Sequence, residues 1–258
     1  MSSILDVEGL GKAFGGVQAV QDVSFSVEQG TICSLIGPNG AGKTTVLNMI
    51  SGLVPPTTGR VSFERRDITN SPAYRMASRG LGRTFQNLAV FAHASVVDNI
   101  LVGMHARLSA DPLTAAVYWG RVRNEEIKAR RRVEEIIDFL EIQNVRDLPV
   151  GTLSYGLQKR VELGRALAIE PRLLLLDEMV SGMNQEETED IARFILDIKE
   201  QLNVTVLMVE HDMGIVMDIS DQVVVLEFGR KIGDGTPTQV SQDPRVMAAY
   251  LGGAGEAA

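Results

Sequence analysis

The first part of the chain alternates hydrophobic and polar positions in a way that is typical of strands. The hydrophobic positions fall into two runs: Ile4, Val7, Val17, Val20, Val23, Phe25 and Val27. A turn is predicted between the runs at Gly15 and Gly16. A short apolar strand at residues 31–36 leads into a glycine-rich loop at 37–42. Helical spacing follows from Val46 to Leu53, and we expect Pro55, Pro56 and Gly59 to end that helix.

The middle of the chain, from about residue 94 to 151, is dominated by helical spacing. An apolar stripe runs along its most charged helix: Val133, Ile136, Ile137 and Leu140. The dense charges between Arg121 and Glu135 are interpreted as the solvated face of that helix. This block therefore reads as a mostly helical insertion within an α/β core.

The α/β pattern resumes after the insertion. The fully apolar run at 173–176 is typical of a strand that is buried on both faces of a parallel sheet. A helix is predicted at 185–202. Further strands are predicted at 204–209, 222–226 and 231–233. The glycine-rich end at 252–255 is expected to be frayed.

Composition narrows the classes of function. The 258 residues are 45% hydrophobic, which argues against disorder, and the formal net charge of −8 disfavours a broad nucleic-acid-binding face. The single cysteine, Cys33, excludes an intrachain disulfide and is interpreted as a small buried core residue. We find no secretory signal and no uncharged apolar run of membrane-spanning length. If the protein works at a membrane, other subunits must hold it there.

The strongest chemical motif is G-P-N-G-A-G-K-T at residues 37–44, between a predicted strand and a predicted helix. This is the P-loop pattern, in which glycines let successive backbone N–H groups face a phosphate and the helix N-terminus adds its dipole. Lys43 is expected to reach the β- and γ-phosphates, and the Thr44 hydroxyl to bind Mg²⁺. By itself, the motif predicts a P-loop nucleotide-binding protein.

A second motif ends the apolar run at 173–176 with Asp177 and Glu178. The carboxyl ends of parallel strands face the ligand, so Asp177 is placed to hold Mg²⁺ and Glu178 to orient or deprotonate the attacking water. A third motif, L-S-Y-G-L-Q, occupies residues 153–158. Alone it predicts only that Ser154 caps a helix, but it lies shortly before Asp177.

The order of these three motifs resembles that of the ATP-binding cassette (ABC) transporters, and the resemblance covers residues 4–251. It implies a P-loop NTPase (RecA-like) core with an antiparallel β subdomain and an inserted helical subdomain. On this basis the core comprises residues 1–93 and 152–235. The helical subdomain comprises residues 94–151, and a C-terminal helical tail residues 236–258.

The resemblance also implies roles for particular residues. The predicted catalytic residues are Glu178, the switch histidine His211, and Gln86 of the R-T-F-Q-N segment. The predicted ATP-binding residues are Phe14 (stacked on adenine), Gly37, Asn39, Gly40, Ala41, Gly42, Lys43, Thr44, Thr45, Ser154 and Gly156. Ser154 and Gly156 would bind the ATP of a partner cassette, and residues 181–184 would cross to that partner. The predicted metal ligands are Thr44, Gln86 and Asp177, and the implied cofactors are ATP and Mg²⁺.

Finer motifs are similar to those of bacterial uptake systems for branched-chain and other hydrophobic amino acids. They include D-N-I-L-V-G at 98–103, V-E-H-D-M at 209–213 and A-A-Y-L-G at 248–252. The resemblance implies a second, different cassette, two transmembrane permease subunits, indirectly a solute-binding protein, and a peripheral place at the cytoplasmic face of the plasma membrane. Relatives of this type also take up urea, short amides or aromatic acids, so those cargoes remain alternatives.

The sequence departs from the usual family pattern at four positions. Met179 stands where the family usually has proline, and Gln185 replaces a frequent proline. Tyr155 and Leu157 stand where glycine and a polar residue are usual in the signature. None of them removes a group that binds phosphate, metal or water.

The sequence disfavours the rival classes of nucleotide-binding protein. A chromosome-maintenance ATPase needs a longer insertion, and a translation-factor ATPase usually carries two cassettes. A P-loop GTPase needs an N-K-x-D motif, and a non-catalytic cassette would lack Glu178 or His211.

Overall fold

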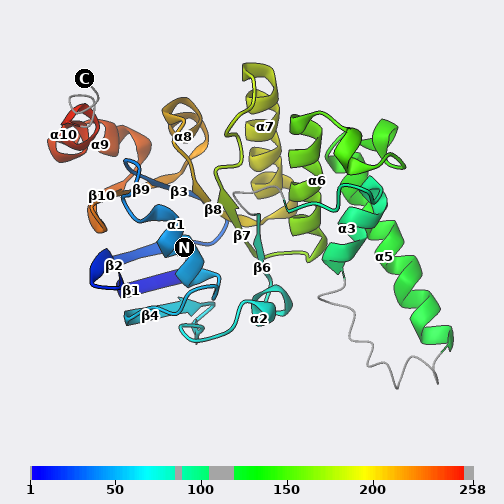
Figure 1. Cartoon of the computed structure of the whole chain (residues 1–258), viewed down its shortest axis with the longest axis horizontal. Coiled ribbons are helices and arrows are strands. Elements are labelled where there is room, and N and C mark those ends of the chain that lie inside the picture. Colours follow the sequence, from blue (N-terminus) through cyan, green and yellow to red (C-terminus); the bar gives the residue numbers. More distant parts are fainter. Residues whose placement is uncertain (1, 85–88, 105–118, 253–258) are drawn as a thin grey trace.

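In the computed structural model, two β-sheets are flanked by helices (Figure 1), and the structure describes residues 2–84, 89–104 and 119–252. The larger sheet has the order β10-β9-β3-β8-β7-β6. Its strands are β3 (Ile32–Ile36), β6 (Leu81–Arg83), β7 (Leu173–Asp177), β8 (Thr205–Val209), β9 (Gln222–Glu227) and β10 (Arg230–Gly235). Five of these strands are parallel and β10 is antiparallel to β9. The chain segments that follow β3, β6, β7 and β8 therefore meet at one edge of the sheet.

Alternate residues of the central strands supply two separate cores, one on each face of the larger sheet. Leu174 and Leu176 pack with helices α7 (Gln185–Leu202) and α8 (Met213–Ile219), whereas Leu173 and Leu175 pack with helix α1 (Lys43–Ile50). This two-sided burial explains why residues 173–176 read as an unbroken apolar run. Cys33 of β3 is buried, as predicted, and burial raises the pKa of its thiol.

The smaller sheet is antiparallel and has the order β2-β1-β4-β5. Its strands are β1 (Ser3–Phe14), β2 (Val17–Glu28), β4 (Thr58–Phe63) and β5 (Arg66–Asp67). Helix α1 lies between the two sheets (Figure 1) and shares one core cluster with both. The prediction that the prolines end this helix was wrong: the helix ends at Ile50, because Gly52 turns into the left-handed conformation (φ 71°).

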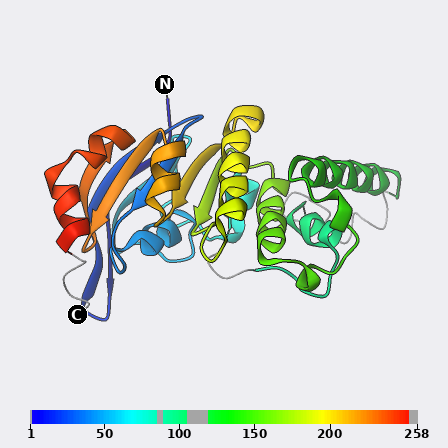
Figure 2. The ribbon, with the colours of Figure 1, turned by 90° about the horizontal axis from the view of Figure 1, so that it is seen from above.

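A helical layer lies at one end of the molecule (Figure 2). It contains α3 (Val96–Met104), α5 (Trp119–Phe139), two short 3₁₀ turns (Gln143–Val145 and Val150–Thr152) and α6 (Tyr155–Ala168). Ile100 of α3, Val133 and Ile137 of α5, and Leu163 of α6 belong to one buried cluster. The packing thus extends the layer into α6, and the predicted division at residues 94 and 151 stays a prediction.

The remaining helices are short or lie at the opposite end of the molecule. They are α2 (Tyr74–Ser78), α9 (Pro237–Ser241) and α10 (Pro244–Gly252). Figures 1 and 2 place α9 and α10 beside β10, far from α5. In the part of the chain that the structure describes, we find no helix with both the length and the apolar character needed to cross a bilayer.

Candidate active site

The loop between β3 and α1 borders a cavity of about 310 Å³. At Gly37 (φ 150°), a Cβ would lie 2.1 Å from the carbonyl oxygen of Leu226, and at Gly42 (φ 98°) it would lie 2.6 Å from that of Ala19. Both positions therefore require glycine. The residues that line the cavity are Ala19, Asn39, Gly40, Ala41, Gly42, Lys43, Thr44, Thr45 and Glu178. All the ATP-binding residues predicted in this loop line the cavity except Gly37, which lies at the start of the turn.

Lys43 is held inside the loop by backbone oxygens. Its Nζ donates hydrogen bonds to the carbonyl oxygens of Gly37 at 2.7 Å and Pro38 at 3.1 Å. Burial lowers the pKa of Lys43, and the negative charges of Glu178 and Asp177 oppose that shift. A partly desolvated ammonium group beside backbone N–H groups at the start of α1 is a site suited to phosphate.

Asp177, the last residue of β7, is 1% exposed. Its Oδ2 accepts a hydrogen bond from Nη2 of Arg83 at 3.0 Å, and its Oδ1 has no hydrogen-bond partner among the described residues. Burial raises the pKa of Asp177, and Arg83 opposes that shift. Asp177 does not line the cavity itself. A buried carboxylate with one oxygen that has no hydrogen-bond partner in the described residues is a group that fits a hard cation such as Mg²⁺.

Glu178 follows Asp177 in the sequence and lines the cavity. Its backbone is left-handed (φ 49°), a conformation that costs a non-glycine residue roughly 1–2 kcal/mol. The hydrogen bond from its backbone N–H to the carbonyl oxygen of Val209, at 2.9 Å, fixes this turn. Strain of this kind gathers at functional sites, and here it places a carboxylate against the phosphate-binding loop.

The segment after β8 lies beside Glu178, because Asp177 and Val209 are paired in the sheet. His211 is exposed two residues beyond Val209. Glu210 between them is buried, and its Oε1 accepts a hydrogen bond from the backbone N–H of Val180 at 3.2 Å. Burial raises the pKa of Glu210 to about 7, although backbone N–H groups oppose the shift.

The L-S-Y-G-L-Q motif forms the start of α6. The Ser154 side chain caps the helix by accepting a hydrogen bond from the backbone N–H of Leu157 at 3.4 Å, and Ser154 is exposed. Gly156 is packed against the start of α7, where a Cβ would lie 2.5 Å from Oε1 of Glu187. Neither residue lines the cavity of the loop. The structure therefore separates the two signature residues from the other predicted ATP-binding groups.

Comparisons with known proteins agree with this architecture. The family model described as "ABC transporter" matches residues 20–181. The chain belongs to the ABC transporter family. Its members hydrolyse ATP to power transport, and the cassette is therefore an ATP-binding and ATP-hydrolysing subunit. The predicted resemblance and fold class are confirmed.

Individual relatives match the cassette along nearly its whole length. The high-affinity branched-chain amino acid transport ATP-binding protein BraF of Pseudomonas aeruginosa is 40% identical over 96% of this chain and 98% of its own. LivG of Escherichia coli, with the same description, is 35% identical over the same shares. A solved structure of MJ1267, "an ATP-binding cassette of an ABC transporter" in its ADP conformation, has a TM-score of 0.85 and 34% identity, covering 98% of this chain and 100% of its own. A second family model, for branched-chain amino acid ATP-binding cassette transporters, matches residues 230–256.

Two further predicted site residues, Phe14 and Gln86, are not among those that line the cavity in the described part of the chain. Phe14 ends β1, is 49% exposed, and has Lys12 Nζ 5.1 Å from its ring centroid; it does not line the cavity. Gln86 lies outside the described residues. The roles given to Phe14, Gln86, His211, Ser154 and Gly156 stay predictions.

Sequence reasoning missed two buried groups of the site, Arg83 and Glu210. Both occur within motifs that were noticed for their neighbours, Gln86 and His211. The signal was present, because a charged residue at the end of a β-strand next to a functional side chain is seldom buried without a partner. The partner itself depends on strand order, which the sequence does not reveal.

Proposed function

We propose that the cassette drives a bacterial importer of branched-chain or other hydrophobic amino acids. The observation that carries the cargo class is the match of residues 230–256 to the branched-chain amino acid cassettes. The relatives BraF and LivG, which are described as branched-chain amino acid transport ATP-binding proteins, support it. Urea, short amides and aromatic acids are the alternative cargoes.

Hydrolysis would take place at the cavity of the loop. The backbone N–H groups of residues 40–45 and the Lys43 ammonium bind the phosphates, and Glu178 orients or deprotonates the attacking water. His211 acts near the γ-phosphate. Thr44, Asp177 and Gln86 would hold Mg²⁺, which when bound neutralises charge on the phosphate oxygens. The buried Oδ1 of Asp177, which has no hydrogen-bond partner in the described residues, supports this assignment.

Each ATP would be shared between two cassettes. Ser154 and Gly156 are separated from the cassette's own phosphate-binding loop, and α6 stands apart from α1 in Figures 1 and 2. Ser154 is exposed at a helix N-terminus, where it is available to the γ-phosphate bound by a second cassette. We expect that second cassette to be a different chain.

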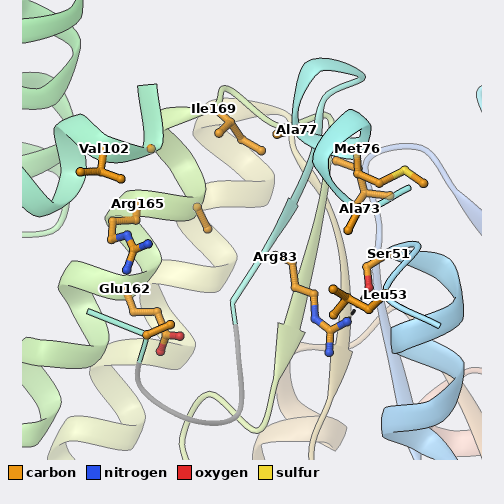
Figure 3. Close-up of a pocket in the computed structure, with 14 residues that line it drawn as sticks. Ser51, Leu53, Ala73, Met76, Ala77, Arg83, Val102, Glu162, Arg165 and Ile169 are labelled. Carbon is orange, nitrogen blue, oxygen red and sulfur yellow. Dashed lines mark hydrogen bonds between the residues drawn. The ribbon is translucent and has the colours of Figure 1, made fainter. Parts of the chain in front are cut away.

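Closure of the two cassettes around ATP would be a rigid-body movement. Two transmembrane permease subunits would receive that movement, with the cassette on the cytoplasmic side of the membrane. We expect the surface near residues 86–97 to contact the permeases. A pocket of about 280 Å³ lies between the core and the helical layer, and Ala89 is among its lining residues. Figure 3 shows Arg83 on one side of the pocket and Glu162 and Arg165 of α6 on the other. Apolar side chains also line the pocket, among them Met76 and Val102, so that the pocket suits an amphipathic segment of a permease.

The proposal is tested by uptake of labelled leucine, phenylalanine and urea in cells carrying either the native cassette or Lys43→Ala at matched expression. We expect the variant to abolish leucine uptake, because the loop loses its phosphate-binding cation. Loss of phenylalanine uptake instead would place the cargo among the other hydrophobic amino acids, and loss of urea uptake alone would reassign it. Unchanged uptake of all three would overturn the transport role for these solutes.

A further inference from the structure

Arg83 joins two parts of the active site that are far apart in the sequence. It ends β6, and only 8% of its side chain is exposed. Its Nη2 donates to Oδ2 of Asp177 at 3.0 Å and to Oδ1 of Asn48 at 2.8 Å. Its Nη1 donates to Ser51 Oγ and to the carbonyl oxygen of Leu47, so the C-terminal part of α1 anchors the guanidinium group.

These contacts leave the two oxygens of Asp177 in different situations. Arg83 occupies Oδ2, whereas Oδ1 is buried and has no hydrogen-bond partner in the described part of the chain. We propose that Arg83 is the positioning residue of the metal-binding carboxylate, holding Asp177 by Oδ2 so that Oδ1 remains available to Mg²⁺. This inference rests on the proposed role of Asp177 as a metal ligand.

The chemistry of arginine suits this task. A guanidinium group presents several donors in a rigid plane, so it can bond Asp177 and α1 at the same time. A lysine ammonium carries the same charge but cannot reproduce that fork. Groups that orient a metal ligand typically change metal affinity by about 10- to 100-fold when they are removed.

Arg83 also forms part of the pocket wall described above. Figure 3 shows its side chain extending from β6 toward Ser51, which lies on the same side of the pocket. A molecule in that pocket would therefore contact the residue that holds Asp177. The position gives the metal site a direct physical connection to the proposed permease surface.

The test compares the affinity of a fluorescent ATP analogue in EDTA with its affinity in Mg²⁺, in the native chain and in Arg83→Met. We expect Arg83→Met to keep its EDTA affinity within about twofold, because Lys43 and the loop are intact. The strengthening by Mg²⁺ should fall by about tenfold or more. Arg83→Lys should recover part of the loss. An unchanged or larger Mg²⁺ effect in Arg83→Met would overturn the proposal.

Two further variants and a control distinguish failure of the metal assignment from failure of the role of Arg83. Asp177→Asn should lose the Mg²⁺ effect; if it does not, the metal assignment fails rather than the role of Arg83. Asn48→Ala removes one anchor of the guanidinium group without touching the ion pair, and it should give an intermediate loss even if Arg83→Met does not fold. Arg172→Met is the matched control, since Arg172 lies just before β7, at the opposite end of that strand, and it should leave the Mg²⁺ effect unchanged.

Discussion

Two helix N-termini of the cassette, those of α1 and α6, are built differently. Gly42 at the start of α1 supplies no side-chain cap, and the residues after it line a cavity of the same chain. Ser154 at the start of α6 caps its helix and is exposed. Helix α1 thus presents bare N–H groups in a hollow, whereas α6 presents a capped end on the surface. This difference is what the proposed sharing of ATP requires, because each chain would then supply one half of each of two sites.

The largest effect should come from two substitutions, one at the cavity beside the start of α1 and one at the start of α6. Glu178→Gln should reduce turnover by roughly 10²- to 10⁴-fold, because the carboxylate that acts on water is lost, and should accumulate an ATP-bound dimer. Adding Ser154→Arg should abolish that dimer, while ATP affinity measured on single chains stays within about twofold. Light scattering and nucleotide titration of the cassette, co-expressed with its partner if the two differ, measure both quantities.

Full steady-state turnover of Glu178→Gln would contradict the role given to that residue. A weaker ATP affinity of single chains in Ser154→Arg would contradict the separation of the two helix starts.

A smaller effect is expected from Glu210, which is buried near the cavity on the α1 side of the comparison. Its folded-state pKa, about 7, is raised from 4.5, so folding favours the protonated form. The contribution to stability is complete below about pH 4.5 and is lost as pH rises through 7. The free energy of unfolding of Glu210→Gln, relative to that of the native chain, should therefore rise between pH 5 and pH 8 by on the order of 1–3 kcal/mol. Thermal unfolding at the two pH values measures this difference.

The exposed Glu200 of α7 provides the control for this measurement, and Glu200→Gln should show no such trend. An equal difference between Glu210→Gln and the native chain at pH 5 and pH 8 would show that Glu210 is not protonated by folding.

The smallest effect belongs to the α6 side. A methyl group at Gly156 would displace Glu187, which forms a capping box with Asn184 at the start of α7. Gly156→Ala should therefore lower the free energy of unfolding by about 1 kcal/mol, measured by denaturant titration. In a Glu187→Ala background the same substitution should cost less, because the capping bond is already absent. Equal costs in both backgrounds would place the strain elsewhere.

The features predicted best from the sequence are those determined by residues that are close together along the chain. The helix predicted at 185–202 has those bounds in the structure, because Asn184 and Glu187 cap it from within four residues. The phosphate-binding loop was predicted for the same reason, since strand, glycines, lysine and helix follow one another directly. Local signals of this kind survive without knowledge of the fold.

Contacts between distant segments were beyond the sequence. Arg83 reaches Asp177, 94 positions away, only because β6 is the edge strand beside β7. Gly156 meets Glu187 only because α6 and the start of α7 are packed together. The end of α1 at Ile50 also escaped prediction, since prolines farther along looked like stronger stops than Gly52.

The pocket wall that contains Arg83 has a pharmacological consequence. A compound that fills this pocket of about 280 Å³ and draws the guanidinium group away from Asp177 would slow ATP hydrolysis. It would do so without occupying the nucleotide cavity. It would lower the affinity for Mg²⁺–ATP, and its inhibition would therefore weaken as Mg²⁺ and ATP are raised. Such a compound would distinguish this cassette from ATPases that share its phosphate-binding loop but not its arginine.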